Sequence, residues 1–277
     1  MLLGYHTNGL QNHRLDDGLR LLADAGYQVV ALTPDTGHLD PFRVTAHEVA
    51  ATAALLDRLG LQVVIETGAR FLLDPAHKHE PTLMTRDPAG RARRLDFYEK
   101  VAAIGVDLGA DVVSFWSGVD REPRPDAWAH LSSGVIAACE RIRDAGLQPS
   151  LEPEPGMALE TTQHWHRLHA ELGTAAPGLT LDIGHLYAVR EGDVPDVIAA
   201  AAPHLRQVHL EDMRWGQHEH LLPGTGDVDF GTVLTTLRQH GYAGPVCFEL
   251  SRSSHCGPDA ARLCAATFAG FGTGLRR

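Results

Sequence analysis

The sequence predicts a single (β/α)8 barrel, or TIM barrel, over residues 1–277, and three observations favour this fold. A chain of 277 residues has the usual length of one such barrel. Short apolar runs alternate with longer amphipathic segments from one end of the chain to the other. No linker or low-complexity tract interrupts this alternation, so one domain is expected. A doubly wound open sheet is the alternative architecture.

Eight short apolar runs are the predicted strands. Because these runs are apolar almost without interruption, we expect both faces of each strand to be buried, as in parallel sheets. The predicted strands cover residues 2–5, 28–32, 62–66, 111–115, 149–152, 179–182, 207–210 and 245–249.

Helical segments are predicted between the strands. Apolar residues recur at helical spacing within residues 15–23, 49–56, 98–106, 135–142 and 233–237. A glycine follows four of these segments and a new strand begins soon after it, which is typical of a helix that ends on a left-handed residue. The histidines at positions 164, 166 and 169 have the spacing of one helix face, so we expect them to be structural.

The composition narrows the range of partners. Acidic residues outnumber basic ones by 35 to 24, and the formal net charge is −11. Such a surface repels phosphate backbones and anionic lipids, which argues against nucleic-acid and membrane partners. No apolar run reaches the roughly 20 residues of a membrane span. The four cysteines form no C-x-x-C pair, so we expect a cytoplasmic protein with reduced thiols.

Four consecutive predicted strands carry potential metal ligands at their carboxyl ends. Glu152, Asp182 and Glu249 end the fifth, sixth and eighth strands, and His209 lies in the seventh. Strand ends meet at one mouth of a barrel, where these carboxylates would repel one another unless they were protonated or bound to a cation. Oxygen ligands with one imidazole favour Mn, with Mg, Co and Zn as alternatives. The competing interpretation is that each acidic residue caps a helix.

These strand ends resemble the xylose isomerase-like barrel superfamily. This group contains sugar isomerases and epimerases, inosose dehydratases and isomerases, and class II AP endonucleases. The resemblance spans nearly the whole chain in its alternation of strands and helices. Its motifs are residues 181–185 (LDIGH), 208–212 (VHLED), 223–230 (PGTGDVDF) and 248–249 (FE).

The resemblance implies roles for five residues. Glu152, Asp182, His209 and Glu249 would bind one divalent metal ion. Glu152 and Glu249 would also act as acid and base on opposite faces of the substrate, at the carbon next to a carbonyl. His185 is similar to the residue that contacts a substrate hydroxyl in the ketose 3-epimerases. Two carboxylates on opposite faces suit epimerisation, because one base alone would favour return of the proton to the same face.

Two residues in the loop after the seventh strand are candidates for the basic residue that binds the substrate. Counting forward from His209 selects Arg214, whereas counting back from the Pro-Gly-x-Gly turn selects His220. His218 and His220 also match the place where AP endonucleases bind an additional zinc ion, with histidine in place of their aspartate. A second metal ion is therefore an alternative to a substrate loop exposed to solvent. A nuclease is less favoured, because the second and fourth strands do not end on histidine.

The first half of the chain is expected to define the substrate. His6, Glu66 and Trp116 lie at the ends of the first, third and fourth strands, and Trp116 would form an apolar wall against a sugar ring. Residues 71–94 form a connection long enough to be a binding loop, in which Lys78 and His79 would contact substrate. A core tryptophan and a solvated basic loop are the alternatives.

Together these features predict a metal-dependent isomerase or epimerase of a free sugar, keto-polyol or cyclitol. Phosphorylated sugars are less favoured, because Asp227 and Asp229 follow the Gly-Thr-Gly turn at residues 224–226 and would repel phosphate. A lyase or dehydratase is the first alternative, with His79, His185 or His220 as the acid. A zinc phosphodiesterase and a barrel without catalytic activity are further alternatives. A homo-oligomer is compatible with the sequence, although no feature requires one.

Overall fold

A computed structural model describes residues 1–272 and arranges eight parallel strands in a closed barrel that follows chain order. The prediction of a (β/α)8 barrel is confirmed, and the strand bounds differ from the predicted ones by at most two residues. The strands are β1 (Leu2–His6), β2 (Val29–Leu32), β3 (Gln62–Glu66), β4 (Val112–Trp116), β5 (Gln148–Glu152), β6 (Gly178–Asp182), β7 (Leu205–Leu210) and β8 (Pro245–Phe248).

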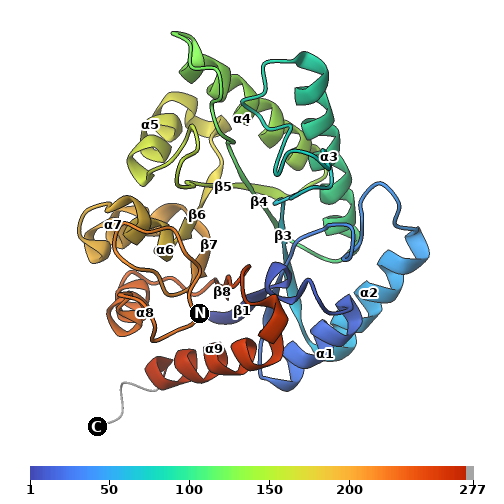
Figure 1. Ribbon diagram of the computed structural model, residues 1–277, viewed down its shortest axis with the longest axis vertical. Helices are drawn as coiled ribbons and strands as arrows, with labels where there is room; N and C mark the ends of the chain where they lie inside the picture. The colour runs from blue at the N-terminus through green and yellow to red at the C-terminus, as the bar shows by residue number, and fades with distance from the viewer. Residues whose placement is uncertain (273–277) are drawn as a thin grey trace. The chain divides into compact units, whose positions relative to one another are not determined.

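Helices connect the strands, and Figure 1 shows the alternation from β1 in blue to α9 in red. The helices are α1 (Leu15–Asp24), α2 (Ala46–Leu59), α3 (Pro88–Asp107), α4 (Ala127–Asp144), α5 (Thr162–Leu172), α6 (Ile183–Val189), α7 (Val194–Ala201), α8 (Phe230–Gln239) and α9 (Gly257–Gly272). No α-helix within residues 1–272 combines the length and the apolar character that a membrane span requires.

The described part of the chain divides into two compact units, and the first contains residues 1–31, 56–62 and 179–272. Within it, β1 pairs with β8, β8 with β7, and β7 with β6, all in parallel. The β6–β7 register places Asp182 beside His209, so two of the predicted ligands are neighbours across one strand pair. The expectation of one domain stays a prediction.

The second unit contains residues 32–55 and 63–178. Here β3 pairs with β4 and β4 with β5, and the β4–β5 register places Trp116 beside Glu152. The connection from β3 to α3 is shorter than predicted. Asp87 accepts hydrogen bonds from Ala89 N and Gly90 N, and Pro88 occupies the first turn of α3. Residues 88–94 are therefore helical, because a capping aspartate followed by proline starts the helix there.

Candidate metal centre

Three of the predicted ligands converge in the first unit. Asp182 ends β6, His209 lies in β7, and Glu249 directly follows β8. One ligand atom from each lies within 4.8 Å of the other two. His209 Nδ1 is 3.4 Å from Glu249 Oε2 and 3.9 Å from Asp182 Oδ2. The side chains of Asp182 and His209 are buried, and that of Glu249 is 16% exposed. These groups form a donor set of two carboxylates and one imidazole.

Asp182 has the features of both a helix cap and a member of the cluster of predicted ligands. Its Oδ1 accepts a hydrogen bond of 2.9 Å from His185 N and so caps α6. Its Oδ2 is buried without a hydrogen-bond partner and lies 3.6 Å from His185 Nε2. One oxygen therefore begins the helix, while the other points into the cluster.

Glu249 is held in place by a residue that the sequence did not single out. Asn8, in the short 3-10 helix that follows β1, donates a hydrogen bond of 2.8 Å from Nδ2 to Glu249 Oε1. Next to it, the rings of His6 and His209 meet edge to face, with centroids 4.2 Å apart. Nothing in the sequence marks Asn8, because its contact joins residues 241 positions apart.

The two carboxylates are kept ionised by the imidazoles around them. Burial alone would raise the pKa of Asp182, but His185 and His209 outweigh burial and lower it. Burial opposes ionisation of Glu249 in the same way, yet the charge of His6 and a hydrogen bond from His209 hold its pKa well below the ordinary value. Two buried negative charges side by side form a site suited to a cation.

The sequence did not single out Glu211 either, and its carboxylate lies within 4.8 Å of ligand atoms of Asp182 and His185. Its side chain is fully buried, with Oε1 at 3.7 Å from His220 Nδ1. Burial raises its pKa well above the ordinary value, and the charges of Asp182 and Glu249 raise it further, which favours the protonated carboxyl group. Its position two residues after His209 was the available signal, since alternate residues of a strand share a face.

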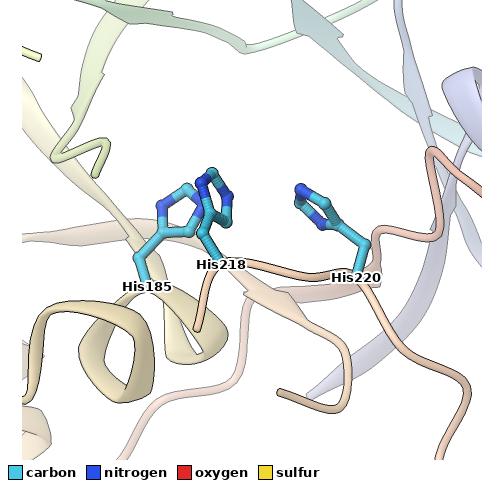
Figure 2. Close-up of side chains that lie close together, drawn as sticks. All are labelled: His185, His218 and His220. Atoms are coloured by element: carbon cyan, nitrogen blue, oxygen red, sulfur yellow. The ribbon is translucent and has the colours of Figure 1, made fainter. Parts of the chain in front are cut away.

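Three histidines form a second cluster in the same unit. Figure 2 shows His185, from the start of α6, with His218 and His220, from the loop between β7 and α8. One ring nitrogen of each lies within 4.8 Å of the other two. Burial lowers the pKa of His218 to about 4, and it also lowers that of His220. Neutral imidazoles can bind hydroxyl groups or a metal ion, so a second ion here stays a prediction.

The two candidates for the basic substrate-binding residue lie in different surroundings. Arg214 forms an ion pair with Glu219, at 2.9 Å from Nη1 to Oε2, and half of its side chain is exposed. The side chain of His220 is 10% exposed and lies in the histidine cluster. The structure brings His220, and not Arg214, together with His185.

The remaining predicted residues belong to the second unit. Glu66, Trp116 and Glu152 are the last residues of β3, β4 and β5, and all three are buried. In the loop before α3, Lys78 is exposed, whereas the His79 ring lies edge-on to Trp116 with the centroids 5.1 Å apart. The metal and substrate roles expected for these residues stay predictions.

The donor set fits a divalent metal ion on structural grounds. The buried Asp182 Oδ2 accepts no hydrogen bond, and a buried carboxylate oxygen is costly unless a partner compensates its charge. The neighbouring Glu249 is ionised as well, so a cation would offset both charges. Oxygen donors with one nitrogen suit Mn, Mg or Zn, and none of the three ligands is a thiolate.

Comparison with known proteins identifies the family of this chain. A family model described as "Xylose isomerase-like TIM barrel" matches residues 19–266. The chain belongs to this family. Because the match covers most of the chain, the resemblance inferred from the strand ends is confirmed.

Named relatives of this xylose isomerase-like barrel include sugar epimerases. L-ribulose-5-phosphate 3-epimerase UlaE of Shigella flexneri is 26% identical over 248 residues, covering 84% of this chain and 80% of the relative. Among solved structures, D-allulose 3-epimerase from Methylomonas sp. superposes with a TM-score of 0.77 at 20% identity, covering 98% and 96% of the two chains. The IOLI protein with a binding zinc atom has a TM-score of 0.78 at 17% identity, covering 98% of each chain.

Proposed function

We propose that this chain is a metal-dependent 3-epimerase or isomerase of an unphosphorylated ketose, keto-polyol or cyclitol. The observation that carries the proposal is the convergence of Asp182, His209 and Glu249, with ligand atoms within 4.8 Å of one another. The names of the relatives support the same chemistry, since they describe 3-epimerases of L-ribulose 5-phosphate and of D-allulose.

Asp182, His209 and Glu249 would hold the metal ion, with Glu152 as the fourth ligand. Glu152 ends β5, which precedes β6 in the order of the barrel. Mn is the preferred ion, with Mg, Co and Zn as alternatives. When bound, a divalent ion polarises a carbonyl and stabilises the negative charge that develops on its oxygen.

Glu249 is the better defined of the two proposed bases. Its lowered pKa keeps the carboxylate ionised at neutral pH, and the Asn8 hydrogen bond fixes one of its oxygens. Glu249 would remove the proton next to the carbonyl to give an enediolate, and Glu152 would return a proton on the opposite face. Transfer in the opposite direction uses the same pair with the roles exchanged.

His185 and His220 are the proposed contacts to substrate oxygens in the first unit. Both imidazoles lie in the buried cluster beside Asp182, and His220 is favoured over Arg214 because Glu219 already engages the arginine. Neutral imidazoles can donate a hydrogen bond to a hydroxyl group from one nitrogen and accept one at the other.

The hydrogen bonds of the glycine turn at residues 224–226 favour an unphosphorylated substrate, because a carboxylate of the protein already binds its N–H groups. Asp212 Oδ2 accepts hydrogen bonds from Gly224 N at 2.8 Å and Thr225 N at 3.0 Å, and its Oδ1 accepts one from Val228 N at 3.1 Å. Backbone N–H groups in such a turn are typical phosphate ligands in barrels. Here an internal carboxylate already takes the place that a phosphate would need.

A dehydratase with the same metal ligands is less favoured. That reaction needs an acid over the leaving hydroxyl, for which His79, His185 and His220 were the candidates. Burial lowers the pKa of His79 to about 4 and also lowers that of His220, so neither is an imidazolium near neutral pH. Mass spectrometry of the product separates the reactions, because a dehydratase loses water and an epimerase conserves mass.

The proposal is tested by incubating the metal-loaded protein in D2O with D-allulose, D-tagatose and L-ribulose 5-phosphate. At least one of the two free ketoses should give an epimer of the same composition, in which one deuterium replaces the hydrogen at the carbon next to the carbonyl. Glu249→Gln should abolish this conversion, whereas Glu140→Gln, on the exposed face of α4, should not. Full activity in Glu249→Gln would refute the two-carboxylate mechanism.

A metal measurement tests the ligand set independently of the substrate. Protein purified without chelator should contain one ion per chain by elemental mass spectrometry. His209→Ala should lose most of it, whereas His240→Ala, which alters an exposed histidine after α8, should retain it. If wild-type protein takes up neither Mn nor Zn, the proposed metal centre is wrong.

A further inference from the structure

A completely buried arginine organises the loop between β3 and α3. The guanidinium of Arg94, in the second turn of α3, donates to three backbone carbonyls of that loop. Nε is 2.7 Å from Pro81 O, Nη1 is 3.3 Å from Thr67 O, and Nη2 donates to His79 O. One side chain therefore ties the start of the loop at Thr67 to its middle part at His79 and Pro81.

The Arg94 charge is buried without an acidic partner. Within residues 1–272, no carboxylate forms an ion pair with it. Instead, its guanidinium carbon lies 4.9 Å from the ring centroid of Trp116, 5.3 Å from that of Phe97 and 5.6 Å from that of Tyr98. The carbonyls, the aromatic faces, the Tyr98 side chain and the more distant charge of Glu80 offset this buried charge, which is otherwise costly. Lysine could not replace it, since one ammonium cannot present the same planar set of donors.

The hydrogen bonds of Arg94 to the loop define the position of the polar side chain of His79. Its backbone has φ of +69°, and its carbonyl is one of the three that Arg94 binds. Its Nδ1 lies 2.8 Å from Gly68 O. A carbonyl oxygen only accepts, so Nδ1 carries the proton and Nε2 presents a lone pair. No described residue donates a hydrogen bond to Nε2.

We propose that Arg94 is a positioning residue for a substrate subsite in which His79 Nε2 accepts a hydrogen bond from a sugar hydroxyl beside the Trp116 ring. The inference rests on the proposed function, and it assigns the specificity-determining contact in the second unit. The lowered pKa of His79, to about 4, agrees with the neutral tautomer that the geometry requires.

The chemistry of the subsite selects a neutral polyol. A hydroxyl group can donate to the Nε2 lone pair, whereas a carboxylate or phosphate dianion would be repelled by it. Trp116 ends β4 and is 7% exposed, and in the proposed subsite its ring would pack against the C–H face of a sugar. Because Arg94 binds the carbonyl of His79 and lies against Trp116, it fixes the relative position of both groups.

A double-mutant cycle with D-tagatose and D-allulose as probes tests this assignment. His79→Ala removes the acceptor and should raise KM about tenfold with little change in kcat. Arg94→Lys should raise KM to a similar extent, and the double variant should be no worse than either single one, because Arg94 acts through His79. His77→Ala, from the same loop, and Arg93→Lys, from the exposed face of α3, are the matched controls and should leave KM unchanged.

The proposal is wrong if the KM of the double variant rises by the product of the two single increases, because the two residues would then act independently. It is also wrong if either single variant keeps the KM of wild type. If Arg94→Lys does not fold, Arg94→Gln, which retains two N–H donors, takes its place in the cycle.

A spectroscopic readout keeps this test separate from the proposed function. Long-range 1H–15N spectra should show the proton of His79 on Nδ1 in wild type and Arg93→Lys, and a mixture of tautomers in Arg94→Lys. Titration with D-tagatose should shift the Nε2 resonance even if the protein converts neither ketose. Absence of turnover with such a shift refutes only the epimerase proposal, whereas absence of the shift refutes the subsite.

Discussion

Asp212 provides the sharpest test of how the loop after β7 is built. Its carboxylate is 1% exposed and accepts four backbone N–H groups. Oδ1 binds Met213 N at 3.0 Å and Val228 N at 3.1 Å, and both contacts are buried. Oδ2 binds Gly224 N at 2.8 Å and Thr225 N at 3.0 Å, where water has partial access.

Replacing Asp212 with Ala should lower the free energy of unfolding by about 3–5 kcal/mol. Each of the two buried N–H groups left unsatisfied costs about 1–3 kcal/mol, and the two partly exposed ones cost less because water replaces the oxygen. The melting temperature should fall by roughly 6–15 °C. Asp212→Asn keeps one acceptor oxygen, so it should lie between the alanine variant and wild type.

Urea denaturation followed by circular dichroism measures these differences. The matched control is Asp227→Ala, in the same loop, which removes a single exposed hydrogen bond from Trp215 N and should cost less than about 1 kcal/mol. If Asp212→Ala costs no more than this control, the carboxylate does not organise the turn, and the argument for an unphosphorylated substrate loses its support.

Three further predictions concern the metal centre and the loop before α3. Glu249→Gln should lower kcat at least about a thousandfold while the melting temperature stays near that of wild type; a loss that saturating metal restores would mean that the residue is only a ligand. Gly184→Ala should lower the free energy of unfolding, measured by urea denaturation, by about 1–3 kcal/mol. The Cβ atom of the new alanine would lie 2.1 Å from Glu211 Oε1, which is too close for either group to keep its place. An unchanged urea midpoint would show that the Glu211 side chain can move aside. Stability should fall as the pH is lowered from about 6.5 towards 4, since the unfolded chain protonates His79 in this range while the folded one does not. His79→Asn should reduce that fall, measured by urea denaturation at pH 7 and 5, by up to about 2 kcal/mol, and an equal fall in both proteins would contradict the assignment.

The strands and the convergence of Asp182, His209 and Glu249 in the first unit could be predicted because local signals agree there. Each strand is a short apolar run bounded by turn residues, and parallel strands buried on both faces require that pattern. Asp182 and His209 lie at strand ends, so the fold alone brings them together. Asp87 and Pro88 also carried a local signal for the start of α3, and the longer predicted loop overlooked it.

Residues whose roles depend on distant contacts could not be predicted. Arg94 lies among other arginines in a stretch that looks solvent-exposed, and its burial depends on the carbonyls of Thr67, His79 and Pro81. Asn8 reaches Glu249 only after the barrel has formed. No periodicity or motif encodes such contacts, because they arise from tertiary packing.

Asp182 both caps α6 and belongs to the proposed metal centre, and this double use would limit how the metal preference of that centre can be engineered. A library that introduces Glu, His or Cys at position 182 to recruit another ion also removes the acceptor of His185 N, which begins α6. The first turn of that helix would then shift and carry the His185 imidazole with it, so ion selectivity and the aim of His185 change in the same step. A successful redesign must rebuild the first turn of α6 together with the ligand. Asp182→Asn is the simplest separating variant, because an asparagine oxygen can still cap the helix while the charge is removed.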